Sequence, residues 1–182
     1  AQQRARQTKM RRRLVKIRTL VRQDRRCRIL VWTGAKPQGT WGHQGCGLAP
    51  STVSSLRRDF AGAAMLRRPG GCTTTAFGMS VGLQADPTVS IRVELLQTWL
   101  EVVARTKVPE AALAKVWAAK KKQLAGPRRW SKVSGPMGAV IATLHDLHWQ
   151  PSCPTRWTDP TGKVWNIDPK GGGIQWHLAY VI

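Results

Sequence analysis

The sequence predicts a mainly α-helical protein, a helical bundle with a small C-terminal β-hairpin annex. Through most of the 182 residues, apolar side chains recur at the three- and four-residue spacing of an amphipathic helix. Proline, glycine and capping residues divide these stripes into segments of helix length. After Pro151 the pattern changes to short alternating runs around a turn, which is typical of strands. A hydrophobic content of 42% is enough to form a core at this length.

The first helix is predicted from four apolar residues on one stripe, Met10, Leu14, Ile17 and Val21. A short apolar run over 28–32 follows, and we expect the Gly/Pro-rich stretch 34–50 to be a structured loop. Ser51 is a candidate N-cap of the next helix. The buried stripe of that helix is Val53, Leu56 and Phe60, and Arg67 and Arg68 are expected in its last turn.

Four further helical segments are predicted. Residues 72–83 form a candidate short helix, and Asp86-Pro87 forms a turn. The next stripe comprises Ile91, Leu95, Leu96, Trp99, Leu100 and Val103. A helix starting at Pro109-Glu110 buries Leu113, Val116, Trp117 and Leu124 and places Lys120–Lys122 in its last turns. A helix starting at Pro136 buries Met137, Val140, Ile141 and Leu144.

The predicted hairpin spans 156–165. Asp159, Pro160 and Gly162 occupy the first, second and fourth positions of a type I turn. The alternation over 174–182 predicts a final strand. Together with the charge distribution, this pattern divides the chain into a basic N-terminal helix or arm over 1–36, a helical domain over 37–134, and a helix with the β-hairpin annex over 135–182.

The charge is the strongest functional signal. The chain has 30 Lys and Arg against 9 Asp and Glu, a formal charge of +21, and almost all of the excess lies in two blocks, 1–36 and 105–132. Such a field concentrates phosphate groups around the protein. Nine tryptophans argue against a disordered basic tail, because such tails contain few large apolar residues. The composition therefore predicts a folded, sequence-nonspecific protein that binds RNA, DNA or both.

The candidate nucleic-acid-binding residues lie in the two basic blocks. They are Arg11, Arg12, Arg13, Lys16, Lys120, Lys121, Lys122, Arg128, Arg129, Trp130 and Lys132. Trp130 and Trp157 lie beside basic residues, where an indole stacks on a base or docks a linker onto the core; both interpretations are open. Because we expect the N-terminal arm to order only on contact, we expect more loss of binding per residue from the second block than from Arg4–Arg13.

The residue patterns argue against catalysis and cofactors. His145, His148 and Cys153 form one candidate metal set, with both histidines on a helix, and His43, Cys46 and Cys27 form another. Both sets lack the paired spacing of zinc sites. The nine acids are scattered and include no Asp-Asp pair, which disfavours two-metal phosphoryl transfer. Neither a GxSxG nor a P-loop motif occurs. The sequence thus predicts a non-catalytic chain without metal or cofactor.

The predicted setting is intracellular. Cys27, Cys46, Cys72 and Cys153 lie far apart, which favours free thiols in a reducing compartment. No apolar run approaches the ~18 residues of a membrane span, so we expect no membrane partner. Nucleic-acid binding favours the nucleus over the cytoplasm.

Several short motifs occur in a recognisable order. They are Trp41-Gly-His-Gln44, Gly47-Leu-Ala-Pro-Ser51, Leu56-Arg-Arg58, Gly71-Cys-Thr-Thr-Thr-Ala76, Asp86-Pro87, Val116-Trp117, Gly135-Pro-Met137, His148-Trp-Gln-Pro151, Pro154-Thr-Arg-Trp157 and Asp159-Pro-Thr-Gly162. Their order over about 28–168 resembles the region downstream of the reverse-transcriptase palm in LINE-like (non-LTR) retrotransposon polyproteins of dinoflagellates.

The resemblance implies a thumb or connection segment that grips the template ahead of an RNase H domain. Neighbouring polymerase and RNase H domains of the same polyprotein would then be its partners. The catalytic Asp pair of that family has no counterpart here. Two alternatives stay open: an RNA-embedded structural protein such as a divergent ribosomal protein, and a metal-dependent nuclease that uses Asp and His groups.

Overall fold

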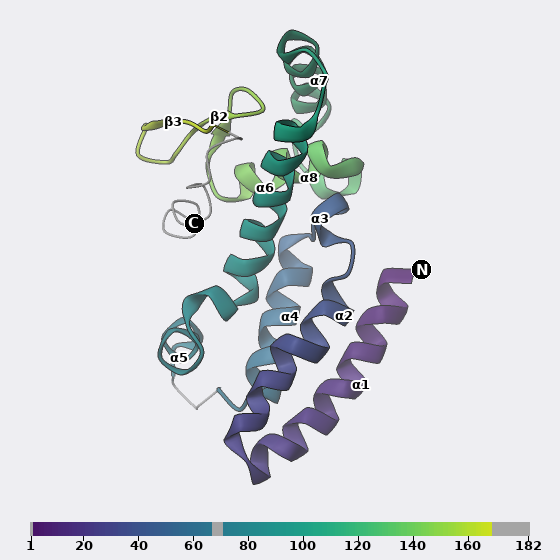
Figure 1. Ribbon diagram of the computed structural model, residues 1–182, viewed down its shortest axis with the longest axis vertical. Coiled ribbons are helices and arrows are strands. Elements are labelled where there is room, and N and C mark those ends of the chain that lie inside the picture. Colours follow the sequence, from purple (N-terminus) through teal and green to yellow (C-terminus); the bar gives the residue numbers. More distant parts are fainter. Residues whose placement is uncertain (1, 67–70, 169–182) are drawn as a thin grey trace. The chain divides into compact units, whose positions relative to one another are not determined.

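The computed structural model describes residues 2–66 and 71–168 (Figure 1). This part of the chain is mainly helical, with a small three-stranded antiparallel sheet near its C-terminal end, which confirms the predicted fold class. Two compact units are present. Unit 1 comprises Ala1–Trp41 and Pro50–Ser90, and unit 2 comprises Gly42–Ala49 and Ile91–Ile182. The three segments predicted from charge and sequence pattern, 1–36, 37–134 and 135–182, were not defined by contacts, so this division stays a prediction.

Unit 1 is built from helices alone in the part that the structure describes. Its elements are α1 (Gln2–Gln23), the 3-10 turn η1 (Arg25–Arg28), the π-helical turn η2 (Val31–Ala35), α2 (Lys36–Thr40), α4 (Pro50–Ala63), α5 (Thr73–Ser80) and the 3-10 turn η3 (Leu83–Ala85). The helix α6 (Pro87–Arg105) begins in this unit and continues into unit 2.

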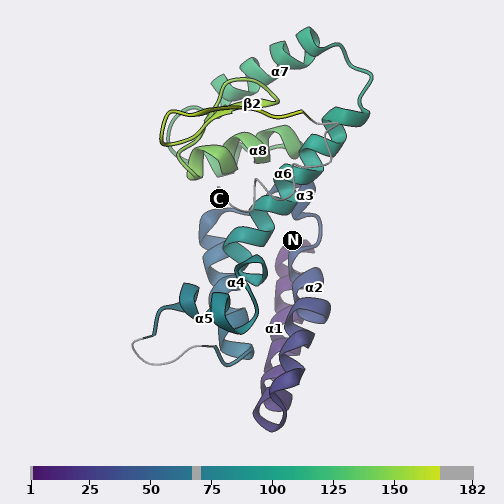
Figure 2. The same ribbon diagram turned by 60° about the vertical axis from the view of Figure 1, so that its left-hand side comes forward.

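The predicted stripe of α1 is confirmed, since Met10, Leu14, Ile17 and Val21 are all buried. They pack α1 against α2 and α4, which lie beside it in both ribbon views (Figure 2). Burying an aliphatic side chain contributes about 1.5–3 kcal/mol, and four such side chains oppose the repulsion among the cations of α1. The expectation that this arm orders only on contact is therefore wrong.

The stretch 34–50 is largely helical, which corrects the predicted loop. It contains part of η2, the whole of α2, and α3 (His43–Cys46). Pro37 lies in the first turn of α2, directly after the helical residues of η2. Gly39 faces Met10, and a Cβ atom there would collide with the Met10 sulfur. Over 31–40, glycine and proline are accommodated within consecutive helical turns.

The helix α4 begins two residues earlier than an N-cap at Ser51 implies. Pro50 is its first residue, so Ser51 lies inside the first turn and is not the N-cap. The predicted stripe of Val53, Leu56 and Phe60 is confirmed. The helix ends at Ala63, and the expected positions of Arg67 and Arg68 lie outside the described residues.

Asp86 is a buried anchor rather than a simple turn residue. Its Oδ1 accepts a hydrogen bond from the Thr88 backbone N–H at 2.9 Å, so it caps the start of α6. Its Oδ2 lies 2.7 Å from Arg57 Nη2 of α4. One carboxylate therefore fixes two helices of unit 1.

Unit 2 adds the sheet to its helices. Its further elements are α7 (Glu110–Gln123), the 3-10 turn η4 (Arg129–Lys132), α8 (Gly135–Asp146), and the strands β1 (Gln150–Pro151), β2 (Arg156–Thr158) and β3 (Val164–Asn166). The strands pair antiparallel in the order β1-β2-β3.

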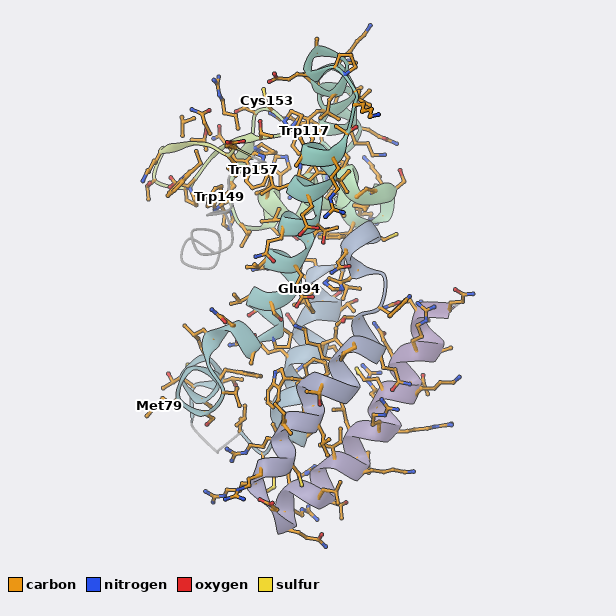
Figure 3. All side chains as sticks on the ribbon, in the orientation of Figure 1. Met79, Glu94, Trp117, Trp149, Cys153 and Trp157 are labelled. Carbon is orange, nitrogen blue, oxygen red and sulfur yellow. The ribbon has the colours of Figure 1, made fainter. Side chains whose placement is uncertain are left out.

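Tryptophans form much of the core of unit 2, as Figure 3 shows for Trp117, Trp149 and Trp157. Trp99 and Trp117 are buried as predicted, with ring centroids 5.5 Å apart, and their indoles donate to the carbonyls of Pro154 and Pro151. Trp157 is fully buried, which favours the docking interpretation over stacking on a base.

The stripes of the unit 2 helices agree with the sequence except at two places. Ile91, Leu95, Leu96 and Leu100 are buried on α6, and Val140, Ile141 and Leu144 on α8. Val116 of α7 is 56% exposed, contrary to its place in the predicted stripe. Trp117 and the capping residue Leu124 of that stripe are fully buried. His148 has a φ of 61°, so it lies beyond the end of α8 rather than on it.

The hairpin turn is confirmed. Gly162 N–H donates to the Asp159 carbonyl at 3.0 Å, and the φ of 89° at Gly162 suits glycine. Hydrogen bonds from Thr161, followed by the indole of Trp165, lower the pKa of Asp159 to about 2. The expected strand over 174–182 lies outside the described residues.

Candidate nucleic-acid interface

The outer face of α1 is a row of cations. Lys9, Arg12 and Lys16 lie at helical spacings of three and four residues, opposite the buried stripe, and all three are exposed. The row is about 10 Å long at the rise of an α-helix. In the part of the chain that is described, none of the three has an ion-pair or hydrogen-bond partner. We define these three residues as the outer row.

The other two predicted sites on α1 are tied to neighbouring elements. Arg11 Nε lies 2.9 Å from Asp59 Oδ2 of α4, and its Nη2 donates to Ser55. Arg13 Nη1 donates to the Gly34 carbonyl at 2.9 Å. Of the predicted α1 residues, Arg12 and Lys16 therefore point to solvent, whereas Arg11 and Arg13 flank the helix contacts.

An open groove of about 290 Å³ lies between α1 and α4 in unit 1. It is lined by Arg11, Leu14, Val15, Arg18, Arg58, Asp59, Gly62 and Ala63. Sequence reasoning missed Arg18 and Arg58 as site residues. The signal for Arg18 was present, because it lies seven residues, or about two turns, after Arg11. The position of Arg58 depends on the packing of two helices far apart in sequence.

The second basic block forms a surface at the end of α7. Lys122 and Arg128 are exposed and have no partner within the described ranges. Lys120 Nζ donates to Gln123 at 2.9 Å and to Ser134 at 2.6 Å. Lys132 Nζ lies 3.4 Å from the Ala125 carbonyl. Two of these four predicted cations are thus partly engaged within the protein.

Trp130 is docked. Its Nε1 donates to Asp146 Oδ2 at 2.7 Å, and a Cβ atom added at Gly47 would approach its ring to 2.9 Å. Gly47 has a φ of 65°, so both its conformation and its contact with the indole favour glycine. Of the two interpretations left open by the sequence, the structure favours docking over base stacking.

Asp146 and His145 lie within the second basic surface. Arg129 Nη1 is 3.6 Å from Asp146 Oδ1. Burial lowers the pKa of His145 first, and the charges of Arg129 and Lys121 lower it further, while Asp146 raises it.

The candidate metal sets are not assembled. Over residues 2–66 and 71–168, no group of three or more His, Cys, Asp or Glu side chains is placed to hold a metal ion. His43 is buried with its Nε2 3.0 Å from Glu94 Oε2 of α6. His145 lies in α8, whereas Cys153 lies in the loop between β1 and β2.

Cys72 was not singled out by the sequence. Its thiol lies before the first turn of α5, where hydrogen bonds from Thr75 and Thr74 lower its pKa from 9.0 to about 7. An exposed thiol with this pKa is substantially ionised at neutral pH.

Comparisons with known proteins identify no relative. No family model, curated protein or solved structure matches the chain. No helix in the described ranges is both long and apolar enough to span a membrane.

Proposed function

We propose that the chain binds nucleic acid through its phosphate backbone without selecting sequence. The observation that carries this proposal is the outer row, three unpartnered cations on a helix that is held by its buried opposite face. Because packing already orders α1, its cations lose less conformational freedom on binding than those of a disordered arm.

The second basic surface supports the proposal. Lys122 and Arg128 are exposed and free for phosphate contact within the described residues. Contacts from cations to phosphates release counterions and read no base edges. The two surfaces therefore favour binding that is strong, dependent on salt and indifferent to sequence.

The salt dependence of binding tests the proposal. If about eight cations contact duplex phosphates, log K falls with log[salt] at a slope near −7. Fluorescence anisotropy with two duplexes of unrelated sequence should give the same slope. Changing Lys9, Arg12 and Lys16 to Gln should make the slope shallower by about 3 units. The charge-preserving control Lys9→Arg, Arg12→Lys, Lys16→Arg should keep it. A salt-independent affinity would refute the proposal.

We also propose that the chain is a non-catalytic thumb or connection segment of a reverse-transcriptase-like polyprotein. Three of the motifs behind the resemblance contain residues with structural roles: Asp86 caps α6, Gly47 contacts the Trp130 ring, and Asp159 closes the hairpin turn. A likeness in such residues concerns the fold rather than chemistry. Sequencing the encoding transcript tests it, because an open reading frame without an upstream palm carrying an Asp pair would contradict it.

A further inference from the structure

The groove between α1 and α4 differs from the outer row in having an apolar floor. Leu14 and Ala63 are buried beneath it, and Val15 beside them is 69% exposed. The groove therefore combines cationic walls with an apolar surface.

The cations of the groove differ in their engagement. Asp59, the acid among the lining residues, is bound by Arg11 at 2.9 Å. Arg18 and Arg58, from the two facing helices, have no partner among the residues that the structure describes. Two free guanidinium groups on opposite walls suit a phosphate, because each can donate two parallel hydrogen bonds to it.

We propose that this groove binds one nucleotide of an unpaired strand. Its phosphate lies between Arg18 and Arg58, and its base lies on the floor formed by Leu14, Val15 and Ala63. The inference rests on the proposed function and narrows it to single-stranded nucleic acid. A duplex keeps its bases stacked inside and offers the groove only phosphate, whereas an unpaired strand turns a base outward onto apolar or guanidinium surfaces.

Gly62 provides a steric test that leaves the charge unchanged. It lies in α4 on the groove lining, and a Cβ atom built there meets nothing within 4 Å. Gly62→Leu adds an apolar side chain to the groove lining at a position with room for the Cβ atom, and leucine is a better helix former than glycine, so the variant should fold. Ala112→Leu is the matched control, since it adds the same side chain at an exposed helical position of unit 2.

The experiment compares the affinities of each variant for an unstructured single strand and for a duplex of equal length at one salt concentration. Gly62→Leu should weaken single-strand binding about tenfold and duplex binding less than twofold, since one base contact is lost. Ala112→Leu should change neither. Arg18→Gln with Arg58→Gln should also weaken single-strand binding.

Three results would overturn the inference. If Gly62→Leu and wild type bound the single strand equally well, the groove would not be a nucleotide site. Salt-dependent duplex binding in the same experiment would leave the proposed function intact. Equal losses for single strand and duplex would assign the groove to phosphate alone. If an acidic peptide bound the groove in competition and the oligonucleotide did not, the groove would be a protein-binding site. Inorganic phosphate at matched ionic strength should not displace the strand, because it has no base.

Discussion

The indole of Trp130 donates a 2.7 Å hydrogen bond to Asp146, which joins the turn η4 to the last residue of α8. Arg129 approaches the other oxygen of the same carboxylate at 3.6 Å. A residue flanked by cations in the sequence thus has its polar edge turned to an acid and its ring against Gly47. Its role in this arrangement is to hold the second basic surface on its unit.

Trp130→Leu tests this role. We expect the free energy of unfolding to fall by about 2 kcal/mol, because the variant loses the hydrogen bond to Asp146 and the leucine side chain buries less apolar surface than the indole. Affinity for nucleic acid, measured on the folded protein, should change less than twofold. Urea unfolding and anisotropy are the two measurements. Unchanged stability with a large loss of affinity would instead support the interpretation that Trp130 stacks on a base.

The spacing of apolar residues predicted the buried face of a helix correctly where that helix packs one face against a single core. The stripe of Met10, Leu14, Ile17 and Val21 was readable from spacing alone, as was the turn at Asp159. The helical form of 34–50 was not readable, because the fit of Gly39 to Met10 depends on tertiary packing. The groove cation Arg58 was hidden for the same reason.

Asp146→Asn separates binding from catalysis. The change removes a negative charge and frees Arg129, while the amide oxygen can still accept from Trp130. We expect tighter binding and a salt slope steeper by about 1 unit. We expect wild type to show no magnesium-dependent cleavage of labelled RNA or DNA. Cleavage that this substitution abolishes would support the metal-nuclease alternative.

His145 makes stability depend on pH. Because burial and then Arg129 and Lys121 lower its pKa below 6.5, the unfolded chain takes up a proton first as pH falls. Stability from this group is complete above about pH 6.5 and decreases from there down to the folded pKa. His145→Gln should flatten the decrease in urea unfolding free energy over that window. An identical pH profile for the variant would contradict this.

Cys72 should be reactive at neutral pH. With a pKa of about 7, its alkylation rate by iodoacetamide should reach half of its maximum near pH 7. Thr75→Ala should move the midpoint upward, but only in part, because the Thr75 backbone N–H remains. Peptide mass mapping follows the site, with Cys72→Ser as the assignment control. A midpoint near 9 would show that these hydrogen bonds do not form.

The last prediction compares the two basic surfaces. The sequence alone favoured Lys120, Lys121, Lys122, Arg128 and Arg129 over the N-terminal residues, because the arm was expected to be disordered. In the structure α1 is packed through its buried stripe, so that reason no longer holds. Lys120 and Arg129 also have partners of their own, Ser134 and Asp146.

A cation that already has a partner must give up or share that contact to bind a phosphate, so it gains less on binding. We therefore expect the triple change of Lys9, Arg12 and Lys16 to Gln to weaken duplex binding more than the triple change of Lys120, Lys121 and Arg129 to Gln. Both variants remove three positive charges, so the net charge of the protein falls by the same amount in each. Binding isotherms at one salt concentration decide the comparison, with thermal melts to confirm that both variants are folded. An equal or larger loss from the Lys120 set would show that the partnered cations rearrange on binding and that the outer row is a solvated helix face.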